Sequence, residues 1–147
     1  MGYRSNVRIV TTRNGFNELK KFTDKYLKDN NYNYGNLLDN LDISHETKHA
    51  KYFGWNAIKW YDGIEGYKDV DAIVDGLNHL EKNNYSYRFA RIGEEYDDYQ
   101  ELSYTSERKN EQDLEYPSMT RYFEDDWVIQ NMDKDQLVIK KDERDER

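Results

Sequence analysis

In the first two thirds of this chain of 147 residues, segments with the hydrophobic period of a β-strand alternate with segments that have the period of an α-helix. Side chains alternate over residues 6–12 and 85–92, as in half-buried β-strands, and residues 99–106 can return as the hairpin partner of 85–92. The aromatic-rich residues 52–61 predict a central or heavily covered strand. Apolar side chains at helical spacing follow residues 6–12 and 52–61. The order strand, helix, strand, helix, strand, strand predicts an α+β fold, with a mainly antiparallel sheet of about four strands and two helices on one face. The nearest known arrangement is ferredoxin-like, although no hairpin is evident between the helices.

The sequence delimits the two helices in different ways. The first is expected to begin at Asn14-Gly15, which offers a turn and an N-cap, and it carries apolar side chains from Phe16 to Leu27. The second has the clearest amphipathic pattern, over residues 70–80, and ends at Asn83-Asn84. Between the helices, residues 37–49 predict a segment that is weakly helical at best.

Aromatic residues supply much of the expected core. Only 36% of the chain is hydrophobic and 35% is charged, but it contains 14 Tyr, 5 Phe and 3 Trp. Each such side chain buries on the order of 150–250 Å², which is enough to predict a folded protein. We expect one domain over residues 1–139, with a core at about 5–106 and a less regular appendix at 107–139 packed onto it. The charged residues 140–147 are expected to form a disordered tail.

The net charge of −8 disfavours direct binding to nucleic acid, because it repels a phosphate backbone. The chain has no cysteine, which suits a reducing compartment. It also has neither a signal-peptide core nor a run of 18 apolar residues. These features predict a cytoplasmic protein that does not contact the membrane.

One motif resembles a metal site. His45, Glu46 and His49 have the spacing at which a helix places two imidazoles on one face to bind zinc, with the glutamate as general base. The neighbouring Lys48 and the polar flanks oppose this interpretation, and no third ligand is evident. The simpler interpretation is an exposed helical turn with Ser44 as its N-cap. We therefore expect no cofactor and no catalytic residue, with a zinc-dependent hydrolase as the alternative.

Two acidic runs, Glu94-Glu95-Tyr96-Asp97-Asp98 and Glu124-Asp125-Asp126, have two interpretations. Each run by itself is typical of a solvated turn. Together with exposed aromatic side chains, however, such carboxylates can imitate the phosphates of DNA and occupy a basic cleft on another protein.

Three segments resemble a set of small accessory proteins encoded by tailed phages and prophages. They are Met1-Gly2-Tyr3-Arg4-Ser5, Trp55-Asn56-Ala57-Ile58-Lys59-Trp60-Tyr61 and Arg91-Ile92-Gly93-Glu94-Glu95, in that order along residues 1–105. The resemblance implies a protein that acts in the host bacterial cytosol on host machinery or on host defence. Known inhibitors of such defences, anti-CRISPR proteins among them, include many small acidic proteins that block by binding. Residues beyond Glu107 depart from this pattern.

The first hypothesis is a protein that inhibits or redirects a host or anti-phage defence protein, such as a nucleic-acid enzyme, by stoichiometric binding. Its expected interface residues are Trp60, Tyr61, Glu94, Glu95, Asp97 and Asp98. The zinc hydrolase is the second hypothesis. A third is a protein that sequesters a small signalling nucleotide, which requires Arg4, Arg8, Arg88 and Arg91 to converge. Since Arg88 and Arg91 lie on opposite sides of a regular strand, this hypothesis ranks last.

Overall fold

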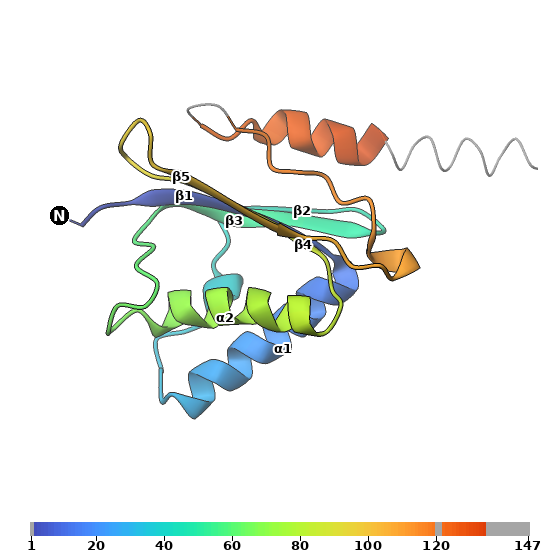
Figure 1. Ribbon diagram of the computed structural model, residues 1–147. Coiled ribbons are helices and arrows are strands. Elements are labelled where there is room, and N and C mark those ends of the chain that lie inside the picture. The colour runs from blue at the N-terminus through green and yellow to red at the C-terminus, as the bar shows by residue number, and fades with distance from the viewer. Residues whose placement is uncertain (1, 120–121, 135–147) are drawn as a thin grey trace, which may run out of the picture.

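The computed structural model describes residues 2–119 and 122–134, and these form a three-layer α+β structure (Figure 1). The elements of the first two layers are β1 (Ser5–Thr12), α1 (Arg13–Asp29), β2 (Ile43–Glu46), β3 (Ala50–Ile58), α2 (Lys68–Lys82), β4 (Tyr87–Ile92) and β5 (Tyr99–Tyr104), with short 3-10 turns η1 (Leu37–Asp39) and η2 (Lys109–Glu111). The strands lie in the order β2-β3-β1-β4-β5, and all neighbours are antiparallel. The predicted α+β class is confirmed, with one strand more than expected.

The β2–β3 hairpin completes the ferredoxin-like order of the first four strands. It closes through the N–H group of Thr47, which donates to the carbonyl oxygen of Ala50 at 2.8 Å. The prediction of weak helical character over residues 37–49 is therefore wrong beyond η1. Strand β2 has only four residues, and of these only Ile43 is apolar, so its alternation carries little hydrophobic signal.

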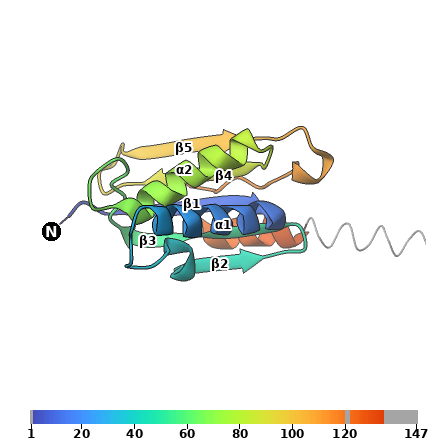
Figure 2. The same cartoon turned by 90° about the horizontal axis from the view of Figure 1, so that it is seen from below.

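Helices α1 and α2 cover one face of the sheet (Figure 2). The first helix begins at Arg13, because the Thr12 hydroxyl oxygen accepts the N–H of Gly15 at 2.9 Å, so Thr12 is the N-cap in place of the predicted Asn14-Gly15. The two helices approach closely at Gly76, where a Cβ atom would collide with Leu19. The core beneath them includes Val7, Ile9, Phe53, Trp55, Ile73, Leu77, Leu80 and Phe89.

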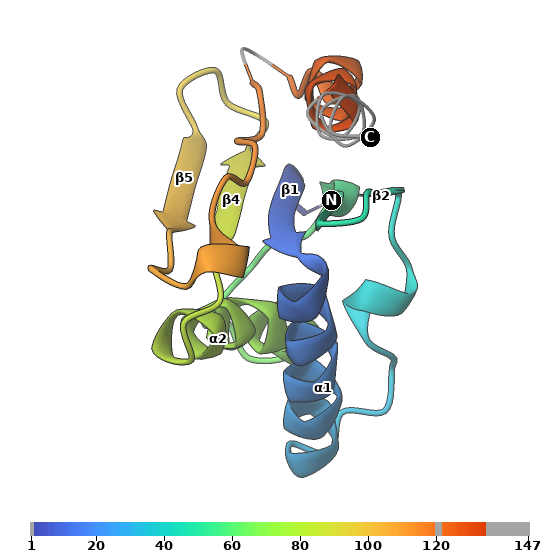
Figure 3. The same cartoon turned by 90° about the vertical axis from the view of Figure 1, so that its right-hand side faces the viewer.

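A third layer, which we call the C-terminal layer, covers the opposite face of the sheet (Figures 1 and 3). It consists of residues 112–119 and 122–134, and its helix begins at Asp125 and continues to Lys134, the last described residue. Val128 and Met132 of this helix pack with Val10 and Tyr52 of the sheet. Strand β1 is consequently covered on both faces, whereas its alternation had predicted a half-buried strand. The expected tail at 140–147 lies outside the described residues.

A buried charge holds the C-terminal layer on the sheet. The Arg8 side chain is only 3% exposed, and its Nε and Nη2 atoms donate to the carboxylate of Asp125 at 2.9 and 3.1 Å. The hydroxyl group of Tyr52 donates to the same carboxylate, and the Arg8 guanidinium lies 5.0 Å from the centre of the Phe123 ring. Burial first, and Asp125 second, raise the pKa of Tyr52, so this hydroxyl stays protonated and able to donate.

Over the described residues, no helix is long and apolar enough to cross a membrane.

We predict that Asp125→Ala destabilises the protein through the buried arginine. The substitution leaves the Arg8 charge without its counter-charge. The free energy of unfolding should fall by about 2–3 kcal/mol, less than the ~3–5 kcal/mol of a fully buried pair because 26% of the Asp125 side chain is exposed. Urea denaturation followed by circular dichroism measures this loss. The matched control is Asp126→Ala, in the same helical turn but exposed, which should change stability by less than about 0.5 kcal/mol. Equal losses in the two variants would contradict the role of the pair.

Candidate functional site

The negative charge of the chain is concentrated in residues 94–127. This stretch contains twelve Asp and Glu residues against three Lys and Arg residues, so it accounts for the whole acidic excess behind the net charge of −8. It forms the β4–β5 turn, strand β5 and much of the C-terminal layer. The rest of the chain is close to electrically neutral, so the acidic excess is confined to this stretch of the sequence.

Exposed aromatic side chains belong to the same stretch. Eight large hydrophobic side chains are exposed among the described residues, and only Tyr34 and Ile64 lie outside residues 94–127. The other six are Tyr96, Tyr99, Leu102, Tyr116, Tyr122 and Trp127. Acidic and aromatic groups are thus displayed together on one part of the molecule.

The β4–β5 turn lies at the end of the sheet where the N-terminus lies, and the C-terminal helix begins over the middle of the sheet (Figure 1). The strand register places Arg8, Ala90 and Glu101 in one row across β1, β4 and β5. Two strand spacings separate the ends of this row, about 10 Å. Asp125 is bound to Arg8, so the C-terminal helix begins above one end of this row. Glu101 lies at the other end of the same row. We call this region the acidic aromatic surface, and define it as Glu94, Glu95, Tyr96, Asp97, Tyr99, Glu101, Tyr122, Glu124 and Trp127.

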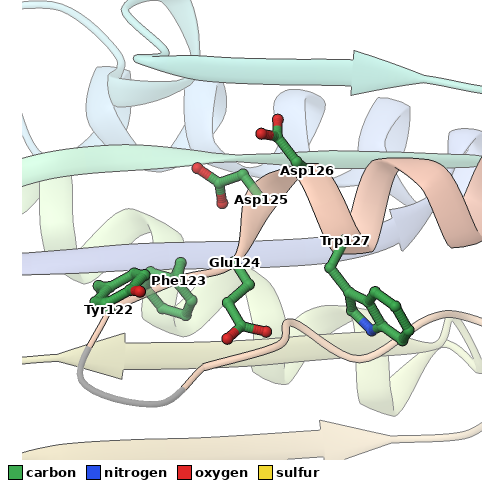
Figure 4. A pocket seen from close by; sticks show the side chains of 6 residues that line it. All are labelled: Tyr122, Phe123, Glu124, Asp125, Asp126 and Trp127. Atoms are coloured by element: carbon green, nitrogen blue, oxygen red, sulfur yellow. The ribbon is translucent and has the colours of Figure 1, made fainter.

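A hollow of about 400 Å³ lies in this surface, lined by residues 122–127 (Figure 4). Glu124 and Trp127 project to one side of the helix start, and Asp125 and Asp126 project to the other. Glu124 accepts a hydrogen bond from the Ser118 hydroxyl at 3.1 Å. Carboxylates beside an exposed indole suit the cationic side chain of a lysine or arginine, which gains an ion pair and a cation–π contact.

The β4–β5 turn is held in shape by Asp98. Its carboxylate accepts hydrogen bonds from Arg91, at 2.8 and 3.1 Å, and from the Tyr3 hydroxyl at 2.6 Å. The Tyr3 oxygen in turn accepts the N–H of Glu95 at 2.9 Å. Gly93 is required beside this cluster, because a Cβ atom there would collide with the Asp98 carboxylate. Asp98 therefore has a structural role.

These contacts also fix the charge state of the turn. The hydrogen bonds from Arg91, and secondly from Tyr3, lower the pKa of Asp98 to about 2. The Asp98 carboxylate raises the pKa of Tyr3 in return. Glu94, Glu95 and Asp97 remain exposed, and they are the carboxylates that the turn presents to solvent.

Two of the expected interface residues have little exposed surface. Trp60 is 7% exposed and packs in the helix-side core, with ring centres 5.7 Å from Trp55 and 5.9 Å from Phe89, so its expected role at an interface does not fit its position. Tyr61 is half-buried against Tyr67 at 4.9 Å. Sequence reasoning missed Tyr99 and Trp127, whose only signal is that each directly follows a run of acidic residues.

The histidine motif lies on the β2–β3 hairpin. His45 is in β2 and His49 is in the turn, so both helical interpretations of this segment, including Ser44 as an N-cap, are wrong. The Nε2 atom of His45 lies 3.0 Å from the Asp133 carboxylate, and that of His49 lies 3.1 Å from the Gln112 carbonyl oxygen. Both histidines thus contact the C-terminal layer. Within residues 2–119 and 122–134, no group of three or more His, Cys, Asp or Glu side chains is arranged to hold a metal ion.

Glu46, the general base of the zinc alternative, belongs to a different interaction. Its carboxylate pairs with the Lys51 ammonium at 3.1 Å, and this contact lowers the pKa of Glu46. A low pKa makes the carboxylate a weaker base. The local geometry therefore gives the hydrolase hypothesis no support.

The four arginines of the nucleotide hypothesis are separated by the sheet. Arg8 and Arg88 are buried under the C-terminal layer, whereas Arg91 pairs across β1 with Val7 on the helix side. Several of their donors already bind the protein itself: Arg91 donates to Asp98, and Arg4 donates to the carbonyl oxygen of Ala57. Arg88 donates to carbonyl oxygens of the β4–β5 pair and lies 4.4 Å from the Tyr116 ring centre. The four side chains form no common cationic site.

We predict that Asp98 titrates near pH 2 in the folded protein. Because its folded pKa lies below the ordinary value of 3.8, Asp98 stabilises the turn fully above about pH 4 and loses this contribution as pH falls through 2. Carbon-detected NMR of the Asp98 carboxyl group measures the midpoint. Arg91→Gln should raise the midpoint towards the ordinary value, and by more than Tyr3→Phe does. A wild-type midpoint near 4 would contradict the described geometry.

Searches against protein-family models, curated proteins and solved structures found no match to this chain. The function is therefore inferred from the surface itself, which combines exposed carboxylates, exposed aromatic rings and a turn held by internal hydrogen bonds.

Proposed function

We propose that this protein acts by binding one-to-one to a positively charged surface of another protein, which it thereby inhibits or redirects. The observation that carries the proposal is the gathering of exposed carboxylates and exposed aromatic rings on the acidic aromatic surface. The sequence resemblance to phage accessory proteins adds the partner class, a host or anti-phage defence protein in the bacterial cytosol.

The two kinds of side chain contribute differently to binding. Exposed carboxylates steer a basic partner during encounter and raise the association rate, but rim charges add little affinity. Affinity comes mainly from aromatic anchors that become desolvated at the centre of an interface. Tyr96 and Trp127, which are 80% and 59% exposed, are the rings best placed to serve in this way.

A nucleic-acid enzyme fits the partner requirement well. Its substrate cleft carries lysine and arginine side chains that contact phosphates at regular intervals. Glu94, Glu95, Asp97 and Glu101 offer carboxylates along a turn and a strand, while the neighbouring rings can occupy places that bases otherwise fill. Binding of this kind excludes nucleic acid by competition and requires no chemistry from the inhibitor.

We predict that reversing the charge of the turn abolishes binding. In the variant Glu94→Lys/Glu95→Lys/Asp97→Lys, the affinity for proteins that the wild type retains from a bacterial host lysate should fall by at least about a hundredfold, because attraction becomes repulsion. Isothermal titration calorimetry with each retained and purified protein measures the affinity and the expected one-to-one stoichiometry. Trp127→Ala should weaken the same binding by about tenfold or more while leaving its salt dependence unchanged.

A second triple variant provides the matched control. Asp29→Lys/Asp39→Lys/Glu81→Lys makes the same change in net charge on the helical side, where these carboxylates are exposed. Its affinity should stay close to that of the wild type. Equal loss in both triple variants would mean that only total charge matters, and unchanged binding in the first would refute the proposed surface.

A further inference from the structure

Strand β5 leaves one edge of the sheet open. It is the last strand in the order, and β4 is its only neighbour among the described residues. Figures 2 and 3, taken at right angles to one another, both show β5 at the margin of the sheet. Five of its six residues are exposed. The outer edge of β5 is therefore accessible along its length.

The hydrogen-bond pattern between β4 and β5 shows which backbone groups of β5 face the open edge. The N–H group of Gly93 donates to the carbonyl oxygen of Asp98 at 2.7 Å, which marks these opposed residues as a hydrogen-bonded pair. Such pairs alternate with non-bonded pairs along an antiparallel ladder. Gln100, Leu102 and Tyr104 therefore bond to β4, and the N–H and C=O groups of Tyr99, Glu101 and Ser103 point outwards.

Glu101 is the one feature of β5 that belongs to the usual protections of an edge strand against strand addition. The six residue pairs of β4 and β5 run in register without a bulge, and the sequence of β5 contains neither proline nor lysine. The opposite edge is different, since β2 has only four residues. An open, regular edge of six residues is suited to accept a strand from another chain.

The carboxylates near the edge of β5 favour a positively charged strand over a negatively charged one. Glu101 lies in the middle of β5, and the acidic turn residues Glu94, Glu95 and Asp97 lie directly before it. Two copies of the chain could also pair through β5, as antiparallel strands related by a two-fold axis. If that axis passes through Glu101 or either neighbouring residue, the two Glu101 side chains lie on one face as direct or diagonal neighbours. Two like charges at that spacing repel each other. Each copy also carries a net charge of −8. A basic strand meets none of this repulsion.

We infer that β5 binds an extended, lysine- or arginine-bearing segment of the partner protein as an additional strand of the sheet. The inference rests on the proposed function and names the structural means of recognition. Main-chain hydrogen bonds to Tyr99, Glu101 and Ser103 fix the segment, and alternate cationic side chains face Glu101. Alternate apolar side chains lie on the opposite face beside Leu102, which is 45% exposed.

A synthetic peptide tests the inference with the full-length protein. The probe is acetyl-Lys-Val-Lys-Thr-Lys-Val-Lys-amide, added at low ionic strength. NMR-detected amide exchange should show protection of Tyr99, Glu101 and Ser103 rising by about tenfold, while Gln100, Leu102 and Tyr104 change little because they already bond to β4. Binding without this alternating pattern, or equal binding by the same peptide N-methylated at alternate residues, would overturn the inference.

Ser103→Pro tests the edge without altering its charge. It removes an outward-facing N–H group and leaves the β4 ladder intact, which edge strands tolerate. Peptide binding should weaken by about fivefold or more, whereas Ser103→Ala, which keeps the N–H group, should bind like the wild type. Equal binding by both variants would overturn the inference. A dimer in sedimentation analysis that Ser103→Pro dissociates would also overturn it, by assigning the edge to a second copy.

The same variants separate this inference from the proposed function. If the retained partner binds Ser103→Pro normally but fails to bind Glu94→Lys/Glu95→Lys/Asp97→Lys, the acidic aromatic surface stands and strand addition is refuted. If both variants lose the partner, strand addition is supported. If Ser103→Pro loses the partner and the charge-reversed variant keeps it, the edge recognises the partner and the proposed role of the acidic turn fails.

Discussion

The buried guanidinium of Arg8 is the constraint on which the arrangement of this protein depends. A cation on the face of a sheet can be covered by apolar residues only when a counter-charge or several hydrogen-bond acceptors come with them. Asp125 supplies that charge from a position 117 residues later in the chain, and Tyr52 completes the shell of hydrogen bonds. The pair determines where the C-terminal helix begins, and hence where Trp127 and Asp126 are displayed.

The layers on the two faces of the sheet differ in composition and in what they expose. The helix-side core is aromatic and closely packed, and it includes Phe53 and Trp60. The C-terminal layer is thinner. It is held by Val128 and Met132, and by the buried Glu111 just before it, which bonds to Thr12 and Ser86. Because this layer needs few apolar residues, its outer side is free to carry the acidic excess.

The sequence allowed prediction of elements whose signal is local, but not of those that depend on distant contacts. Helix α2 was predictable because its apolar residues recur at helical spacing. Strand β2 was not, since its burial comes from Ile43 and His45 contacting a layer encoded some 90 residues later. Trp60 resembled a surface anchor because an aromatic side chain looks the same in sequence whether it is buried or exposed. The exposed Glu94, Glu95 and Asp97 were predictable, whereas Asp98 was not, because only the fold brings Tyr3 and Arg91 to it.

The link between Tyr3 and the β4–β5 turn has a practical consequence for handling this protein. The Tyr3 hydroxyl bridges Asp98 and the backbone of Glu95, so whatever precedes residue 3 emerges beside the acidic turn. An affinity tag or fluorescent label fused at that terminus would sit next to the carboxylates of the proposed binding surface. A polyhistidine tag, which is weakly cationic, would even compete for them. Labels are better carried on the helical side, for example at Asn17 or Asn78, both of which are exposed.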